Sequence, residues 1–461
     1  MLLPAAAAYP AAARLYNPRF DAQVHPAAIA LCASAADVTA CVRFAAAGGA
    51  PLRLRAGGHS YGGWSTGEGL IADVSHLSTV SVDTASGLAR IGAGARLVDV
   101  YTALGARGVA IAAGSCPTVG ITGLTLGGGI GVLARAFGLT CDALRSVQIV
   151  TADGRLREVD ATADPDLFWA LRGGGGGSFG AVTALTMAVR PAPNVQTFFL
   201  DWDLQHGESV LGAWQGWMSN ADNRLWSTCK LLADPGRGAQ HARVAGTWIG
   251  PARDLPAQLS ALRSRINAPP ASASGQSLDY THAMLLEAGC SRQTAEQCVV
   301  DALSPAKRQP FAATSAILAH ALPAEGITAA VQGARAGLEV ANMVEGGVSF
   351  DALGGAVAAV SPGATAFVHR PALASMQYAA TWASMSGPAG PVSTAPFDAY
   401  VRSQRSAMAR WTGPGAYANY ADPQIRDYGT AYWGANYPRL QAVKKHYDPH
   451  NLFTFPQAVR G

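Results

Sequence analysis

The sequence lacks any run of about 18 or more apolar residues, the length a helix needs to cross a bilayer, so we expect no membrane-spanning segment. Lysine is scarce, with four in 461 residues, and no dense basic run accompanies the net charge of +4. Because nucleic-acid binding needs a basic stripe, we expect no nucleic-acid partner. We also identify no set of residues that indicates a metal site.

Two common nucleotide-binding motifs are missing. The sequence has no GxxxxGK[ST] segment, which excludes a P-loop. None of its glycine-rich loops fits the strand–GxGxxG–helix unit with an acidic residue about 20 positions further on. A dinucleotide site of the Rossmann type is therefore disfavoured.

Glycine, in contrast, is abundant. The chain has 52 glycines and 49% hydrophobic residues, a globular composition that is long enough for two or three domains. The glycines gather in loops at Gly57-Gly58, from Gly114 to Gly131 and from Gly173 to Gly177. Each loop follows a predicted strand or helix and can present a row of backbone N–H groups to an anionic pyrophosphate. This pattern indicates backbone packed closely against a ligand.

Hydrophobic periodicity predicts alternating strands and helices in the first 190 residues. A strand at 29–31 precedes a helix that Ser34 caps and Gly48-Gly49 ends. Further strands are expected at 51–55, 70–74, 89–93, 147–151 and 180–189, with helices at 97–104 and 164–171. After Pro191 the glycine loops thin out and aromatic residues and longer helical stretches take over. We divide the chain into residues 1–195, which bind nucleotide, an inserted substrate domain at 196–410, and a segment at 411–461 that returns to the first domain.

The compartment stays open. Residues 1–13 are apolar and Ala-rich, but they carry no positive start and are broken by two prolines, which favours the edge of a domain over a signal peptide. Seven cysteines are an odd number. Cys290 and Cys298 share a short polar segment and could pair, whereas Cys32 and Cys41 are equally compatible with buried thiols. A disulfide would support an oxidising compartment, so both a secreted bacterial protein without its leader and a cytoplasmic one remain compatible.

Four ordered motifs resemble those of one family. They are Arg55-Ala-Gly-Gly-His59-Ser-Tyr61, Gly114-Ser-Cys116-Pro-Thr-Val-Gly120, Leu126-Gly-Gly-Gly129 and Leu171-Arg-Gly-Gly-Gly175. Together they resemble the FAD domain of berberine-bridge-enzyme-like oxidases, in the vanillyl-alcohol-oxidase superfamily. Tyr417-Ala-Asn-Tyr420-Ala-Asp422 and Tyr447-Asp-Pro-His-Asn451-Leu-Phe453 resemble the closing motifs of that family. The resemblance implies an α+β fold, with an FAD-binding domain of the PCMH type (two α/β subdomains) and a substrate domain whose antiparallel sheet is covered by helices.

The resemblance also implies a flavin held at two points. His59 takes the place of the histidine that bonds to the 8α carbon of the isoalloxazine, and Cys116 that of the cysteine that bonds to carbon 6. Taken singly, each residue fits an ordinary loop histidine or a small buried thiol. Val119 takes the position that controls access of dioxygen, where valine accompanies oxidases, so we expect hydrogen peroxide as co-product. Other cofactor-binding residues carried over are Arg55, Gly57, Gly58, Ser60, Gly120, Gly123, Gly127, Gly128, Gly176, Gly180, Val182 and Asn451.

A base must take a hydroxyl proton while hydride leaves for the flavin. The resemblance assigns this role to Tyr420, with Tyr417 nearby, and a nearby cation or hydrogen-bond partner would have to lower a phenol pKa of about 10. Asp351 resembles the acidic partner of carbohydrate-oxidising members, although a turn aspartate is equally compatible. We expect His369, Arg370, Gln377 and Tyr378 to border the same cavity. Phe453 should support the flavin edge, as could Tyr432, Trp433 and Asn436.

The substrate class is left between alternatives. Carbohydrate or oligosaccharide alcohols stand slightly ahead of secondary metabolites, for which the protein would be a tailoring oxidase. A flavin-bound protein without turnover is the third alternative. Trp202, Trp248 and Trp382 could stack on sugars, but buried core tryptophans are the commoner case. Specificity is expected to reside in the inserted domain, 196–410, and the resemblance is weakest over residues 196–340 of it. The sequence leaves the oligomeric state open.

Overall fold

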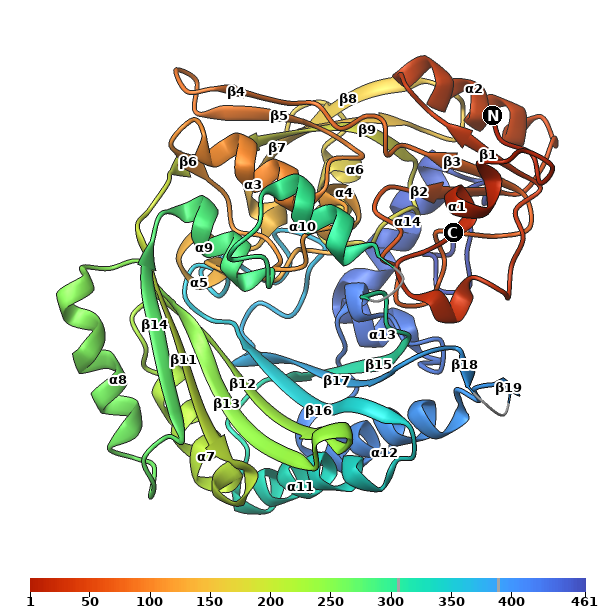
Figure 1. Cartoon of the computed structure of the whole chain (residues 1–461). Coiled ribbons are helices and arrows are strands. Elements are labelled where there is room, and N and C mark those ends of the chain that lie inside the picture. Colours follow the sequence, from red (N-terminus) through yellow and green to blue (C-terminus); the bar gives the residue numbers. More distant parts are fainter. Residues whose placement is uncertain (305–306, 388–389) are drawn as a thin grey trace.

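In the computed structural model of the chain, which describes residues 1–304, 307–387 and 390–461, three main sheets surround a central cavity (Figure 1). The first sheet is parallel and has the order β1 (Ala28–Leu31), β3 (Leu70–Asp73), β2 (Leu52–Arg55). Helix α1 (Tyr9–Ala13) and helix α2 (Ala35–Ala46) accompany it. Ser34 and Asp37 form a capping box at the start of α2, which confirms the predicted cap.

The second sheet is antiparallel. Its order is β4 (Val80–Asp83), β5 (Leu88–Gly92), β9 (Ala181–Ala188), β7 (Leu144–Val150), β8 (Leu156–Asp160). The helices of this region are α3 (Leu97–Gly105), α4 (Ile121–Leu126), α5 (Ala134–Phe137) and α6 (Pro165–Ala170), and β6 (Val109–Ala110) pairs with β10 (Arg190–Pro191). The strands and helices predicted for residues 29–189 are confirmed, with small shifts at their ends.

The third sheet has seven antiparallel strands. Its order is β14 (Ser272–Leu278), β11 (Val195–Asp203), β13 (Ala239–Trp248), β12 (Leu225–Asp234), β16 (Met343–Ala352), β17 (Ala374–Trp382), β15 (Phe311–Leu318). Helices α7 (Gly207–Met218), α11 (Ala324–Arg335) and α12 (Ala395–Thr412) cover one face, and α8 (Leu255–Arg263) packs on α7 (Figure 1). This arrangement confirms the expected helix-covered antiparallel sheet.

Side chains alternate between the two faces of this sheet, as strand geometry requires. The helix-covered face is apolar and includes Trp202, Trp248 and Trp382, which are buried core residues here rather than sugar-stacking platforms. The opposite face turns residues such as Lys230 and Asp351 toward the cavity. The sheet therefore has one apolar face, which packs against the helices, and one face with polar residues, which lines the cavity.

The remaining elements lie outside the three main sheets, and of these α9 (Tyr280–Glu287) and α13 (Tyr428–Trp433) contribute residues to the cavity. Helices α9 and α10 (Ala295–Ala302) lie beside α3, and α13 and α14 (Tyr437–Tyr447) belong to the C-terminal part; β18 (Ser386–Gly387) pairs with β19 (Gly390–Pro391). Residues of 416–459 share one hydrophobic core with the first two sheets. No helix of the part of the chain that the structure describes is long and apolar enough to cross a membrane.

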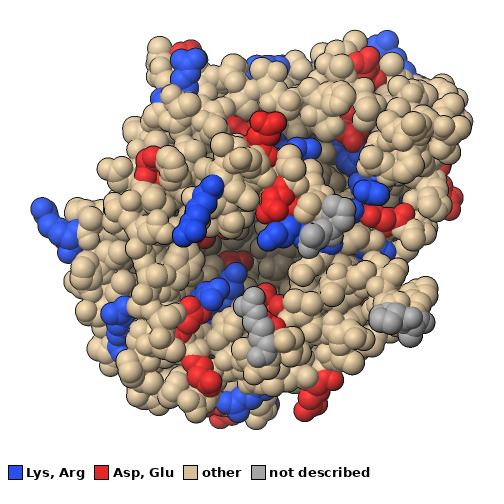
Figure 2. Space-filling model, viewed as in Figure 1, with Lys and Arg blue, Asp and Glu red and all other residues tan. Residues whose placement is uncertain are grey.

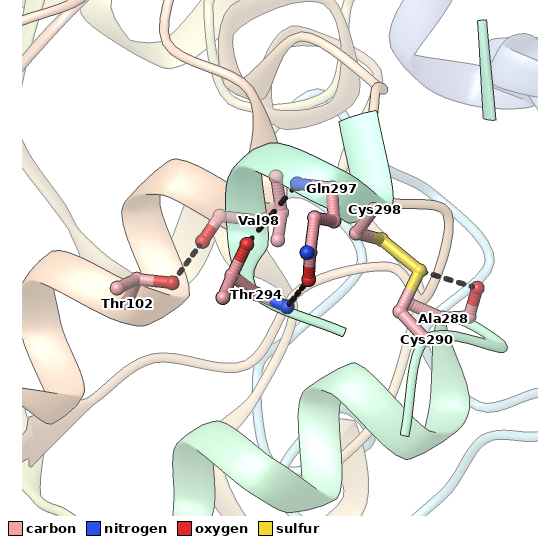
Figure 3. The surroundings of a disulfide bond; sticks show 7 residues. All are labelled: Val98, Thr102, Ala288, Cys290, Thr294, Gln297 and Cys298. Atoms are coloured by element: carbon pink, nitrogen blue, oxygen red, sulfur yellow. Dashed lines mark hydrogen bonds between the residues drawn. A yellow bond between two sulfur atoms is a disulfide. The ribbon is translucent and has the colours of Figure 1, made fainter. Parts of the chain in front are cut away.

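Cysteine pairing is settled by the structure. Cys290 and Cys298 form a disulfide that closes the turn between α9 and α10, and Val98 of α3 packs against it (Figure 3). Thr294 and Gln297 form a capping box at the start of α10 within the same loop. Cys32 and Cys41 are free buried thiols, with their sulfur atoms 3.9 Å apart.

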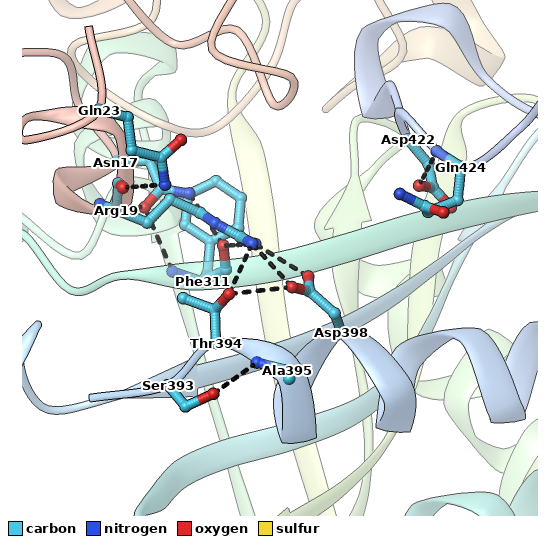
Figure 4. A network of polar contacts seen from close by, with 10 residues as sticks. All are labelled: Asn17, Arg19, Gln23, Phe311, Ser393, Thr394, Ala395, Asp398, Asp422 and Gln424. Atoms are coloured by element: carbon cyan, nitrogen blue, oxygen red, sulfur yellow. Dashed lines mark hydrogen bonds and ion pairs between the residues drawn. The ribbon is translucent and has the colours of Figure 1, made fainter. Parts of the chain in front are cut away.

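A polar network ties the N-terminal segment to the third sheet (Figure 4). Arg19 donates to both carboxylate oxygens of Asp398 on α12, at 3.1 and 2.9 Å. Asn17 donates to the carbonyl oxygen of Phe311 on β15, at 2.9 Å. The segment before β1 therefore binds the far wall of the cavity as well as its own sheet.

Candidate functional site

A cavity of about 560 Å³ lies between the glycine loops and the polar face of the seven-stranded sheet. Figure 2 shows this side of the molecule hollowed near its centre, with acidic and basic side chains around the opening. Most of the residues assigned from the motifs line the cavity: Arg55, Gly57, Gly58, His59, Ser60, Cys116, Val119, Gly120, Gly123, Gly176, Gly180, Val182, Asp351, Tyr417 and Tyr420. The glycine loops, strand β16 and the C-terminal segment, which are far apart in the sequence, thus meet at one cavity.

The loops of the first two motifs touch. A Cβ atom built on Gly57 would lie 2.3 Å from the backbone nitrogen of Gly120, and one on Gly120 would lie 2.5 Å from that of Gly57. Only glycine permits this approach. The contact joins the loop of His59 to the loop of Cys116.

His59 is a neutral, fixed imidazole. Its Nε2 lies 2.8 Å from Thr118 Oγ1, and its ring stacks on Tyr16 with centroids 3.8 Å apart. Burial, and then the charge of Arg96, lowers the pKa of His59 to about 3. Among the described residues Nδ1 has no hydrogen-bond partner.

Cys116 is a free cysteine whose side chain opens on the cavity. Burial by the surrounding protein raises the pKa of its thiol, and the charge of Lys230 lowers that pKa in part. Val119 lines the cavity three residues further on.

Several buried polar atoms of the lining have no partner among the described residues. They are Arg55 Nη1, Ser65 Oγ, Thr122 Oγ1, Trp226 Nε1 and Glu287 Oε1. Arg55 is held by its other nitrogens, since Nε donates to Asp73 at 2.7 Å and Nη2 to the carbonyl of Ala12 at 2.6 Å. Buried polar atoms normally find partners, so these fit a bound group rich in hydroxyl and phosphate oxygens.

Tyr420 and Asp351 face each other in the sheet half of the cavity. The Tyr420 hydroxyl makes a long hydrogen bond of 3.5 Å to Asp351 Oδ2, and Ser349 donates to Asp351 Oδ1 at 3.2 Å. Tyr61 stacks on Tyr420 with centroids 5.2 Å apart, and Gln377 donates to the Tyr61 hydroxyl at 2.7 Å. The aspartate is thus a partner of the tyrosine and not a turn residue on the surface.

The pKa of Tyr420 departs from expectation. We expected a cation or hydrogen-bond partner to lower it, but burial and then the charge of Asp351 raise it well above its ordinary value. Burial also raises the pKa of Asp351, which Lys230, Ser349 and Tyr420 partly offset. Any proton that Tyr420 accepts must therefore be passed on.

Tyr417 lines the cavity beside Tyr420, and its hydroxyl is bound to the glycine loop. Its hydroxyl oxygen accepts hydrogen bonds from the backbone of Gly129 and Ile130, at 3.0 and 3.1 Å, and from Asn419 at 2.8 Å. Burial raises its pKa to about 12. These hydrogen bonds occupy the lone pairs of the Tyr417 hydroxyl and tie it to the glycine loop.

Some residues assigned to the cofactor lie outside the lining. A Cβ on Gly127 would lie 2.0 Å from Asn419 Oδ1, and Gly128, at φ 115°, packs against Phe367, so both serve close packing behind the loop. Asn451 is exposed in a left-handed turn at φ 52°, and the neighbouring Phe453 lines the cavity instead.

Of the residues expected around the cavity, some line it and others lie outside the lining. Gln377, Tyr432 and Trp433 line it, but Asn436 donates to loop carbonyls at 362, 365 and 366. Tyr378, next to Gln377 on β17, points to the opposite face because side chains alternate along a strand. Arg370 pairs with Asp142 at 2.7 Å, and His369 packs against Phe367.

Four charged residues of the lining do not follow from the sequence motifs: Arg53, Lys230, Arg243 and Glu287. Lys230 and Arg243 interrupt apolar strands, β12 and β13, so their alternation was the available signal. Glu287 ends α9 and carries no signal in the sequence.

Comparisons with known proteins agree with this arrangement. Residues 26–160 match the family model described as an FAD binding domain, and residues 416–460 match the one described as berberine and berberine like. The FAD-linked oxidoreductase YgaK of Bacillus subtilis is 32% identical over 450 residues, which cover 96% of this chain and 93% of that protein. The chain belongs to the berberine-bridge-enzyme-like family of FAD-linked oxidases.

Other members of this family show how far the likeness extends. The chitooligosaccharide oxidase of Gibberella zeae is 30% identical over 466 residues, covering 96% of this chain and 89% of that enzyme. The solved structure of BBE-like 1 from Physcomitrella patens has a TM-score of 0.89 at 29% identity and covers 99% of this chain and 96% of its own. The protein is therefore an FAD-dependent oxidoreductase with the PCMH-type fold, related to carbohydrate oxidases.

Proposed function

We propose that this oxidase holds FAD covalently through His59 and Cys116 and oxidises a hydroxyl group of a carbohydrate or oligosaccharide. The observation that carries the proposal is the Tyr420–Asp351 pair, which shares one cavity with both anchor residues. Relatives that are named for oligosaccharide oxidation support the substrate class.

The residues present fit FAD. His59 would bond to the flavin through Nδ1, since Nε2 is engaged by Thr118. Cys116 would supply its sulfur as the second anchor. The unpartnered atoms of Arg55, Ser65 and Thr122 would donate to oxygens of the cofactor. When bound, FAD would supply an acceptor for the hydride of the substrate carbon, with dioxygen as the final oxidant.

The chain's own residues move the proton. Tyr420 accepts the proton of the substrate hydroxyl while its own phenolic proton passes to Asp351 Oδ2. Because the pKa of Tyr420 is raised, a free phenolate is avoided and Asp351 takes the net proton. The raised pKa of Asp351 makes it a better acceptor. Tyr61, itself held by Gln377, keeps the ring of Tyr420 in place.

Val119 supports the use of dioxygen. Its side chain lines the cavity close to Cys116 and is smaller than the leucine that family resemblance associates with dehydrogenases. We propose hydrogen peroxide as co-product on this steric ground.

The test is anaerobic flavin reduction by a panel of alcohols. Bleaching of the flavin absorbance by sugars, with peroxide formed on readmission of air, would support the proposal. Bleaching only by phenolic or other secondary-metabolite alcohols would assign the protein to tailoring chemistry. A flavin that stays oxidised across the panel would leave a binding protein without turnover.

A further inference from the structure

Polar side chains form a row across the cavity-facing side of the seven-stranded sheet. The strand register places Asp201 opposite Arg243, Arg243 opposite Lys230, Lys230 opposite Ser349, and Ser349 opposite Gln377. Directly opposed side chains in antiparallel strands have Cβ atoms about 5 Å apart. Lys230 and Arg243 are therefore neighbours on the floor of the cavity, which both of them line.

Of these two cations, only Arg243 has a direct ion-pair partner among the described residues. Arg243 Nε donates to Asp201 Oδ1 at 2.6 Å, and Ser272 donates to Asp201 Oδ2 at 3.2 Å. Lys230 makes no hydrogen bond or ion pair with the residues that the structure describes. Like charges directly opposite each other weaken a sheet, so folding alone does not favour this arrangement. An anionic ligand would offset the repulsion between Lys230 and Arg243.

Glu287 adds a second, independent sign of a ligand. It lines the cavity from the end of α9, and its Oε1 is buried without a hydrogen-bond partner among the described residues. Burial raises its pKa to about 7, although the charge of Lys230 opposes this rise. A carboxyl group in this range can hold a proton at neutral pH and donate it in a hydrogen bond.

We propose that Lys230 and Arg243 bind a carboxylate of the substrate, with Glu287 donating a hydrogen bond to it, so that the oxidised alcohol belongs to a sugar acid such as a uronic acid residue. The inference rests on the proposed function and names its substrate class. A cationic substrate would meet two positive side chains on the floor. Two cations and one neutral donor suit a group with a single negative charge.

The register also relates this subsite to the reacting group. Lys230 lies opposite Ser349, and Asp351 is two residues further along β16 on the same face. Such diagonal positions are about 7–8 Å apart. Lys230 and the Tyr420–Asp351 pair therefore lie close enough for one sugar substrate to contact both.

The test compares the binding of two ligands, one charged and one neutral but otherwise alike, to the holoenzyme. Methyl β-D-glucuronoside and its uronamide differ only in the charged group, and their dissociation constants are measured anaerobically by calorimetry. Because hydrogen bonds to charged groups contribute about 1.5–3 kcal/mol, we expect the uronate to bind the wild type at least about tenfold more tightly. Lys230→Met should abolish this preference, Lys230→Arg should restore it, and Lys445→Met, at an exposed lysine of α14, should leave it unchanged.

The outcomes separate the two proposals. Three results would overturn the carboxylate subsite. They are equal binding of the uronate and the uronamide to the wild type, loss of the preference in Lys445→Met, and tighter binding of glucose 6-phosphate than of the uronate. A retained preference with a flavin that no sugar reduces would refute the oxidation of carbohydrates and leave the subsite standing. Retention of FAD and an unchanged melting temperature in Lys230→Met show that the variant has folded.

Discussion

The Tyr420 hydroxyl lies 3.5 Å from Oδ2 of Asp351, across the boundary between the C-terminal segment and the seven-stranded sheet. Both groups have raised pKa values, and burial is the first cause in each. In the proposed mechanism, a phenol that is hard to ionise and a carboxyl group that is easy to protonate form a proton relay, with Asp351 as the final acceptor.

The relay predicts the effect of removing its first member. Tyr420→Phe should slow anaerobic flavin reduction by about 100-fold or more, because the hydroxyl proton loses its acceptor. The amount of bound FAD should not change. Tyr378→Phe provides a matched control, since this tyrosine is buried on the opposite face of the same sheet. A small effect of Tyr420→Phe, or an equal effect of both variants, would move the base to another residue.

The relay also predicts a pH dependence. Asp351 must be ionised to receive the proton, so the reduction rate should fall as the pH is lowered through its pKa. Because that pKa is raised, the fall should occur at higher pH than an ordinary aspartate would give. Stopped-flow reduction across the pH range measures it, and Asp351→Asn should remove this limb together with most of the rate. A limb that survives in Asp351→Asn belongs to a different group.

Sequence reasoning located the glycine loops because their residues are contiguous and backbone contact demands glycine. The contact of Gly57 with Gly120 is an example. It failed where tertiary packing decides: Tyr417 belongs to the same motif as Tyr420, but its hydroxyl is consumed by Gly129 and Ile130. Asn451 stands in a matching motif and faces solvent.

Lys230 and Arg243 were missed for a further reason. They become neighbours only through the register of β12 and β13, which the sequence of either strand does not specify. The Asp201 that compensates Arg243 comes from a third strand. A cluster assembled across strands leaves no spacing signal along the chain.

The two proposed anchors can be removed one at a time. We expect His59→Ala and Cys116→Ala each to keep FAD attached through the remaining anchor, so that acid-precipitated protein stays yellow. The double variant should release all its flavin on precipitation, while noncovalent binding in the folded state persists through the glycine loops. Mass spectrometry of tryptic peptides identifies the attached residue. A colourless precipitate from the wild type would refute covalent attachment.

Val119 offers a test of the reaction with dioxygen. Val119→Leu adds one methylene to a side chain that lines the cavity, and it should slow reoxidation of the reduced protein severalfold or more. Reduction by substrate should change little, because Tyr420 and Asp351 are untouched. Val300→Leu, at an exposed position of α10, is the control. Unchanged reoxidation in Val119→Leu would show that this side chain does not limit oxygen access.

The Cys290–Cys298 disulfide closes a short loop, with a sequence separation of 8, immediately after the helix that carries Glu287. Constraint of the unfolded chain by a loop of this size contributes about 2–3 kcal/mol to the free energy of unfolding. A Cys290→Ser, Cys298→Ser double variant should therefore unfold at lower denaturant concentration than the wild type. Dithiothreitol should lower the midpoint of the wild type toward that of the variant and leave the variant itself unchanged. If the reductant shifts both proteins equally, its effect arises elsewhere in the chain and the disulfide does not stabilise this loop.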